Sequence, residues 1–213
     1  MIPESLQKTL KTKLQIHFSI YILYAIVLFS SIFNQKFDSL VLITTAFITI
    51  YLHELAHIFA GHYFGINTEK IILSVIGGMA FLDVKKIKSS KESLLISLAG
   101  PTLNITLAAI TYLMLMCINI NFLNIVFTLN LMIGIFNLIP LYPLDGGRIL
   151  KSALLLLGVS VKQTNFIILY VLRVAGVILL CLCLYNLYII PAIIFFLQLL
   201  FINKNFLEQD NCI

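Results

Sequence analysis

The 213-residue chain is 61% hydrophobic and only 11% charged, with a mean hydropathy of +1.05. Soluble domains carry about 25% charged residues, so this composition excludes an ordinary soluble fold and favours a protein built in a lipid bilayer. The net charge of +5 comes from basic residues clustered beside apolar runs, which argues against a folded nucleic-acid-binding surface and against a nucleic-acid partner.

Apolar runs that approach the length of a membrane span recur along the chain. A span needs roughly 20 apolar residues, and six runs come near that length: 14–33, 39–64, 93–118, 122–140, 164–186 and 188–203. Only a few residues separate the last two. We therefore predict an all-α polytopic membrane protein with about six transmembrane helices, forming a single membrane-embedded domain over residues 1–213.

The loops between these runs differ in their basic residues. Lysines and arginines gather in the tail before the first run and in the loops 65–92 and 141–163, whereas the connections 34–38 and 119–121 carry one lysine and none. Cytoplasmic loops of membrane proteins are the ones enriched in lysine and arginine. The alternation predicts that both termini lie in the cytoplasm.

The long loop 65–92 holds a second apolar segment, residues 71–81, that is too short to span. It contains the pair Gly77-Gly78, which favours a chain reversal. We predict a short re-entrant or membrane-surface β-hairpin that turns at these glycines. Non-helical backbone at membrane depth must be covered by protein or line a water-filled cavity.

The second run contains His53-Glu54-Leu55-Ala56-His57, an H-E-x-x-H pattern. Residues four apart lie on one face of a helix, so His53 and His57 can bind the same metal ion, and Glu54 can reach a water on that ion. Two imidazoles and a carboxylate suit zinc with an open position for water. Because ionisable groups inside a span are costly and usually functional, a metal-free pair of buried histidines is the weaker interpretation.

The third ligand must come from elsewhere in the chain. Apart from Glu54, only Asp145 among the carboxylates lies in a largely apolar stretch, just before Gly146-Gly147 and after two prolines that prevent regular helix. Taken alone, Asp145 could equally be the N-cap of a helix that begins near Gly146. Because the metal site is otherwise incomplete, we predict that Asp145 is the third ligand.

The position of the motif within its run sets the depth of the metal. His53 follows the start of the predicted second span by about 14 residues, or roughly 21 Å along a helix. In a hydrocarbon core about 30 Å thick, this places the metal inside the membrane and nearer the cytoplasmic side. Water would then reach the site from the cytoplasm.

Together with Gly77-Gly78, the segment Ala99-Gly100-Pro101-Thr102-Leu103-Asn104 and the N-x-x-P-x-x-P-x-D-G-G-R stretch from Asn137, the motif resembles the site-2 protease family of intramembrane zinc metalloproteases. The resemblance spans about residues 45–150. It implies a zinc endopeptidase with ligands His53, His57 and Asp145 and with Glu54 as the catalyst. It also implies that Asn137 and Pro140 lie beside the substrate, and the Gly77-Gly78 hairpin would pair with the substrate as an added strand.

The extended aspartate motif is most similar to the stage IV sporulation protein FB branch. That branch implies a substrate, the membrane-tethered precursor of sigma-K (pro-sigma-K), and two membrane regulators, stage IV sporulation protein FA and BofA. It also implies a bacterial cell membrane, the mother-cell membrane around the forespore. Several relatives carry a C-terminal CBS domain; because this sequence ends at Ile213, soon after the last predicted span, we expect none.

Three other functions fit parts of the pattern. A protease of the same type could act on a different membrane-tethered regulator. A zinc transporter would need a polar path, but the outer halves of the spans lack ionisable residues apart from His17 and Arg173. A catalytically inactive zinc-binding relative would lack a site residue, and none is missing.

Overall fold

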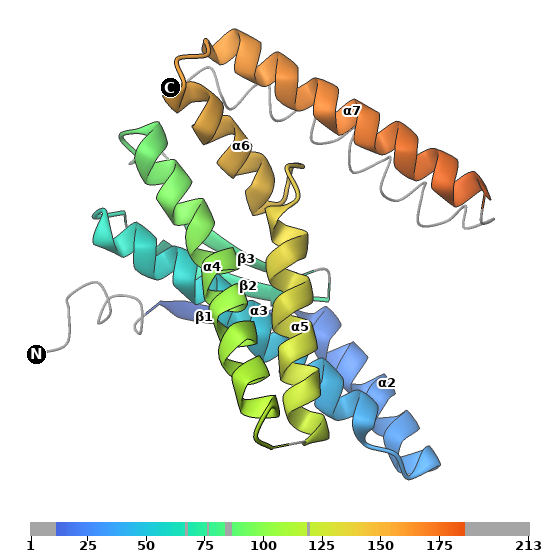
Figure 1. Cartoon of the computed structure of the whole chain (residues 1–213). Coiled ribbons are helices and arrows are strands. Elements are labelled where there is room, and N and C mark those ends of the chain that lie inside the picture. Colours follow the sequence, from blue (N-terminus) through green and yellow to red (C-terminus); the bar gives the residue numbers. More distant parts are fainter. Residues whose placement is uncertain (1–11, 67, 76, 84–86, 119, 186–213) are drawn as a thin grey trace, which may run out of the picture. The chain divides into compact units, whose positions relative to one another are not determined.

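The structure, a computed structural model, describes residues 12–66, 68–75, 77–83, 87–118 and 120–185 (Figure 1). The chain divides into two compact units, Met1–Asn137 and Leu138–Ile213. The elements of the first unit are β1 (Lys13–Ile16), α2 (Phe18–Asn34), α3 (Asp38–Tyr63), β2 (Thr68–Ser74), β3 (Gly77–Leu82), α4 (Ser90–Leu115) and α5 (Asn121–Leu138), whose last residue begins the second unit. The second unit contains α6 (Asp145–Leu156) and α7 (Val161–Tyr185).

Three of the described helices, α3, α4 and α5, are long and apolar enough to cross a membrane. Helix α2 is apolar but has only 17 residues. The predicted span 164–186 coincides with helix α7, and the predicted span 188–203 lies outside the described residues. The described part of the chain therefore supports a mostly helical membrane protein with three candidate spans, and the prediction of six spans is not confirmed.

The first predicted span is wrong at its start. Residues 13–16 form strand β1, which pairs in parallel with β2 from Lys13↔Lys70 to Ile16↔Leu73. Polar Lys13 and Gln15 alternate with apolar neighbours in this segment, which is the period of a strand and not of a span. Helix α2 begins only after His17, whose backbone N–H donates to Leu73 O at 2.8 Å and whose ring accepts from Ser19 N.

The predicted hairpin is confirmed, with its turn displaced by two residues. Strands β2 and β3 are antiparallel, and the pair Ser74↔Gly77 closes the hairpin. Gly77 and Gly78 are therefore the first residues of β3 and do not form the turn itself. Gly77 has φ of +142°, a backbone conformation that other residues rarely adopt. The strand order β1-β2-β3 leaves β3 at an edge of the sheet.

A small apolar core joins the sheet to the first two helices. It consists of Ile20 of α2, Ile58 of α3, and Ile71 and Leu73 of β2, each no more than 6% exposed. Tyr24 adds a polar link, because its Oη donates to Thr44 Oγ1 at 3.0 Å. These contacts fix the hairpin against α3, the helix that carries the H-E-x-x-H motif.

Helix α4 packs along α3, and side-chain hydrogen bonds close its first turn. Ser89 Oγ accepts from Glu92 N at 3.2 Å, and Glu92 Oε2 accepts from Lys88 N at 2.8 Å. The first of these bonds satisfies an amide that a helix start leaves open. Further along α4, Ile96 and Asn104 lie opposite the motif on α3, where they contact His57 and His53.

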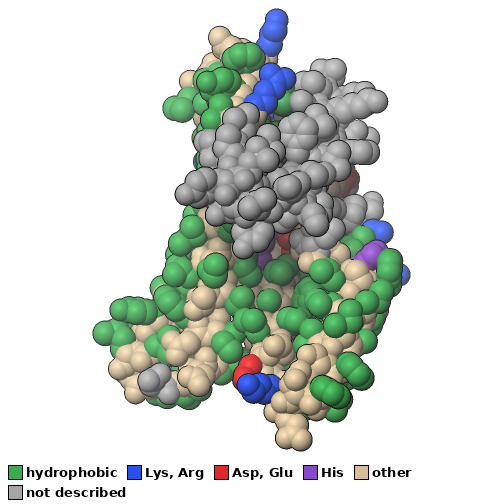
Figure 2. Space-filling view, turned by 90° about the vertical axis from the view of Figure 1, so that its right-hand side faces the viewer, with side chains coloured by type: hydrophobic (Ala, Val, Ile, Leu, Met, Phe, Trp, Pro, Cys, Tyr) green, Lys and Arg blue, Asp and Glu red, His purple; other side chains and the backbone are tan. Residues whose placement is uncertain are grey.

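Hydrophobic side chains cover much of the described surface on the face that Figure 2 shows, where lysine and arginine side chains are few. Large apolar residues such as Phe29, Phe33 and Leu113 are more than 60% exposed on the helices. A water-soluble protein rarely exposes so many large apolar side chains. Together with the three candidate spans, this surface fits a protein surrounded by lipid.

In the second unit, the segment 138–144 folds back against the start of α6. A Cβ on Gly146 would collide with the carbonyl oxygens of Ile139 and Leu138, and one on Gly147 would lie 2.7 Å from Tyr142 N. Only glycine fits at these two positions. Helix α6 ends at Leu156 and is followed by Gly158 with φ of +84°, a common helix stop.

The core beneath the hairpin yields a test of the fold. Ile71 is fully buried, so Ile71→Ala removes packed methyl groups and should lower the free energy of unfolding by about 2–4 kcal/mol. Ile22→Ala, on the exposed face of α2 (53% exposed), should leave it nearly unchanged. Denaturant unfolding of both variants in detergent micelles measures the difference, and equal stabilities would contradict the assigned core.

Candidate metal centre

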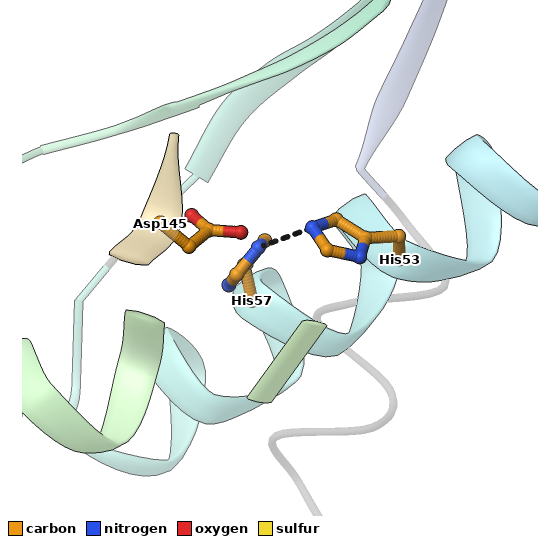
Figure 3. A group of neighbouring side chains, drawn as sticks. All are labelled: His53, His57 and Asp145. Atoms are coloured by element: carbon orange, nitrogen blue, oxygen red, sulfur yellow. Dashed lines mark hydrogen bonds between the residues drawn. The ribbon is translucent and has the colours of Figure 1, made fainter. Parts of the chain in front are cut away.

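His53 and His57 lie one turn apart on α3 and turn their imidazoles toward each other (Figure 3). Their Nε2 atoms are 3.0 Å apart, and the rings meet edge to face at 78°. Both side chains are buried, at 4% and 6% exposure. The spacing of the motif predicted this shared face, and the structure has it.

The outer nitrogen of each ring is held by an oxygen from α4. His57 Nδ1 lies 2.7 Å from Ile96 O, and His53 Nδ1 lies 2.5 Å from Asn104 Oδ1. A carbonyl oxygen can only accept, so each Nδ1 must carry the proton of its ring. In the neutral rings, the two Nε2 atoms that face each other are then both lone-pair acceptors.

This arrangement fits a metal ion. Two lone pairs 3.0 Å apart repel unless a proton or a metal ion lies between them. Metal-bound histidines characteristically donate their other N–H to an oxygen, as both rings do here. Two imidazole nitrogens on a tetrahedral zinc, each at 2.0–2.1 Å, are roughly 3.3 Å apart. The observed separation is close to that value.

Gly100 of α4 keeps the space in front of the two nitrogens open. A Cβ built on Gly100 would lie 2.6 Å from His53 Nε2 and still closer to His57 Nε2. No side chain larger than hydrogen fits there without displacing both rings. The sequence pattern included Gly100 in the family resemblance but gave it no role.

Glu54 lies beside the histidines on α3 and is half-buried. Its Oε2 accepts a hydrogen bond from Ala80 N of β3 at 3.0 Å. Because β2 lies on the other side of β3, this amide belongs to the free edge of the sheet. The carboxylate of the motif is thus held at the edge strand of the hairpin.

Gly78 explains how the strand comes so close to the helix. A Cβ on Gly78 would lie 2.7 Å from Glu54 Cγ and 2.8 Å from Ile50 Cγ2. The absence of a side chain lets β3 pass directly over Glu54. Gly77, in contrast, has no atom near a built Cβ and is required by its backbone conformation.

In the second unit, Asp145 is the first residue of α6 and is half-buried. The N-cap is Leu144, so the alternative role of Asp145 as the capping residue is not the one observed. The tight packing of Gly146 and Gly147 against the preceding segment fixes the backbone that carries this carboxylate.

The structure also locates the two residues that the resemblance placed beside a substrate. Asn137, at the end of the first unit, donates from Nδ2 to Ile133 O of its own helix at 2.9 Å. Pro140 is exposed in the segment before α6. Their contact with a substrate stays a prediction.

Two buried asparagines lie behind His53, and the sequence alone predicted no role for either. Asn104 is 1% exposed and Asn130 of α5 is 3% exposed, and Asn104 Nδ2 donates to Asn130 Oδ1 at 3.1 Å. The usable signal was an asparagine inside each of two apolar helices, because a buried amide needs hydrogen-bonding partners.

Comparison with known proteins identifies relatives of this chain. The model of peptidase family M50 matches residues 41–120 and 117–182. A zinc metalloprotease of Methanocaldococcus jannaschii is 36% identical over 152 residues, which cover 69% of this chain and 44% of that protein. A putative zinc metalloprotease of Bacillus subtilis, YwhC, is 30% identical over 161 residues, 58% of this chain and 73% of that protein.

A solved structure has a similar fold. The site-2 protease from Methanocaldococcus jannaschii superposes with a TM-score of 0.66 at 30% identity, covering 88% of this chain and 87% of the other. The chain spans less than half the length of the first curated relatives that it matches, 44% in one case and 28% in another. The family match covers both histidines and Asp145, and the chain belongs to peptidase family M50, the site-2 protease family.

Proposed function

We propose that this protein is an intramembrane zinc endopeptidase that cuts a membrane-associated protein. The observation that carries the proposal is the pair of buried imidazoles with both Nδ1 atoms bonded to oxygens and both Nε2 atoms converging. Membership of a family whose named relatives are zinc metalloproteases supports it.

In this proposal, His53, His57 and Asp145 hold the metal, because two imidazoles and a carboxylate are a donor set that zinc takes in hydrolases. Zinc in such a set supplies a Lewis acid that activates water and polarises a peptide carbonyl. Glu54 accepts the proton that the water loses on attack and returns it to the leaving amine. Its bond to Ala80 N aims the carboxylate and would have to be shared or exchanged as the proton moves.

The edge of β3 supports a position for the substrate. A helical peptide carbonyl is already hydrogen-bonded and shielded, so the substrate must be extended at the cleaved bond. An extended segment that adds to the free edge of β3 would run past Glu54, since Ala80 of that edge already contacts the carboxylate. Asn137 and Pro140 would contact the same segment, and the site would open toward the cytoplasm.

Replacing the carboxylate of the motif tests the reaction. Glu54→Gln keeps an oxygen for Ala80 N but cannot accept the proton, so the cleavage rate should fall by about 10²–10⁴-fold while zinc content stays unchanged. Cleavage of a single-span substrate in proteoliposomes and elemental analysis measure the two quantities. Glu92→Gln, at the start of α4, is the matched control and should retain activity. Full activity in Glu54→Gln would refute the mechanism.

Filling the space before the histidines tests the metal. Gly100→Ala puts a methyl group against both Nε2 atoms and should lower zinc occupancy at least about 10-fold in the presence of a competing chelator. Gly61→Ala on α3 is the control, because the one close contact of its methyl group would be with the flexible end of Leu82, and zinc should stay bound. Equal zinc content in the two variants would contradict the placement of the metal.

We further propose that the substrate is pro-sigma-K, with regulation by proteins resembling stage IV sporulation protein FA and BofA. The form of the N-x-x-P-x-x-P-x-D-G-G-R stretch from Asn137 supports this proposal. Co-expression with pro-sigma-K should give a shortened product on an immunoblot, and Glu54→Gln should give none. Intact pro-sigma-K beside a cleaved alternative substrate would instead favour a different membrane-tethered regulator.

A further inference from the structure

A chain of hydrogen bonds runs from the imidazole of His53 through two buried amides to the backbone of α5. Asn104 Oδ1 lies 2.5 Å from His53 Nδ1, Asn104 Nδ2 donates to Asn130 Oδ1 at 3.1 Å, and Asn130 Nδ2 donates to Val126 O at 2.9 Å. The chain crosses three helices, α3, α4 and α5. None of its amides is a predicted ligand or catalyst.

The carbonyl oxygen of Val126, at one end of this series of hydrogen bonds, determines which group donates in each bond. Val126 O can only accept, so Asn130 must turn its NH₂ group to Val126 and its oxygen to Asn104. Asn104 must then give its NH₂ group to Asn130 and present its oxygen to His53. That oxygen accepts only from a protonated Nδ1, which leaves the lone pair of His53 on Nε2, the atom that faces His57.

Burial makes the direction costly to reverse. His53, Asn104 and Asn130 are each 4% exposed or less, so water is not available to replace a lost partner. A buried amide without a partner costs about 1–3 kcal/mol. Reversal of either amide would place two oxygens or two NH₂ groups against each other.

The tautomer of His57 is fixed in the same way, but by a backbone group and not by a side chain. Its Nδ1 is bonded to Ile96 O, a backbone carbonyl of α4 that cannot rotate. His53 has a rotatable amide in the corresponding place, and that amide has two orientations of equal shape. Asn130 is what distinguishes the two orientations, because its oxygen accepts the NH₂ group of Asn104.

We propose that Asn104 and Asn130 are positioning residues that hold His53 in the tautomer able to bind zinc. The proposal rests on the proposed zinc site and adds a means by which α5, which carries none of the predicted ligands, controls metal affinity. Removal of Asn130 frees the amide of Asn104 to turn. His53 then divides between two tautomers, one of which has a proton on the metal-binding nitrogen.

Two measurements on the full chain in detergent micelles test the proposal. Zinc affinity, from chelator competition, should fall about 10–100-fold in Asn104→Leu and by a smaller factor in Asn130→Leu. Nitrogen NMR of ¹⁵N-histidine-labelled, zinc-free protein reports which ring nitrogen of His53 carries the proton. The wild type should show the proton on Nδ1, and Asn130→Leu should show a mixture of the two tautomers.

Controls separate positioning from packing. Thr111→Val removes a buried hydroxyl of α4 that bonds only Leu107 O of its own helix, and it should change neither measurement. Asn130→Asp should rescue zinc affinity relative to Asn130→Leu, because a neutral carboxylic acid donates to Val126 O and accepts from Asn104 in the same shape. In an Asn104→Leu background, Asn130→Leu should cause no further loss, since it acts through Asn104.

The outcomes distinguish this proposal from the proposed protease. Wild-type zinc affinity and an unchanged His53 tautomer in folded Asn130→Leu would overturn the positioning role. Equal losses in Asn130→Asp and Asn130→Leu would also overturn it, because they would indicate packing alone. A wild-type protein that binds zinc but cuts no substrate would contradict the protease and leave the tautomer measurement valid.

Discussion

Two imidazoles that share a helix face inside an apolar protein impose one requirement on everything around them: both must offer the same nitrogen to the same point. His53 and His57 meet it with Nε2 atoms 3.0 Å apart, where two lone pairs repel unless a proton or a metal ion lies between them. A free histidine exchanges readily between tautomers. The surrounding helix α4 removes that freedom, because Ile96 O and Asn104 Oδ1 each hold an Nδ1 proton.

Helix α4 therefore orients both histidines, although the histidines themselves belong to α3. One turn supplies the oxygen for His57, the next supplies Gly100 to leave room, and the following one supplies the oxygen for His53. The hairpin performs a matching task for Glu54. Its strand passes close enough to bond the carboxylate because Gly78 has no side chain. The two histidines and Glu54 thus lie close together on α3, but two different elements position them: α4 holds the histidines and β3 holds Glu54.

The sequence predicted the features that depend on local spacing. The i, i+4 histidines, the helical runs of α3, α4 and α5 and the presence of a hairpin follow from periodicity and length alone. Strand β1 was missed because its four residues adjoin an apolar run, and only pairing with a distant strand makes them extended. The roles of Gly100 and Asn104 were missed for a related reason. Neither residue type is among the usual ligands of zinc, so their importance appears only when α4 lies against the histidines. The role of Asp145 as a ligand was predicted from composition and stays a prediction.

The two asparagines show what an apolar sequence context can still reveal. In a helix surrounded by lipid or protein, a carboxamide has no water to bond, so its presence implies a partner of fixed chemistry. Asn104 donates to Asn130, and the oxygen of Asn104 and the NH₂ group of Asn130 each need a partner outside the pair. One end is a backbone carbonyl, which can only accept, and the other is an imidazole, which can either accept or donate. The backbone carbonyl, which cannot change its role, therefore determines which nitrogen of the imidazole carries the proton. Such a series of hydrogen bonds places no net charge in the membrane. Through it, a backbone carbonyl of one helix selects the tautomer of a histidine on another.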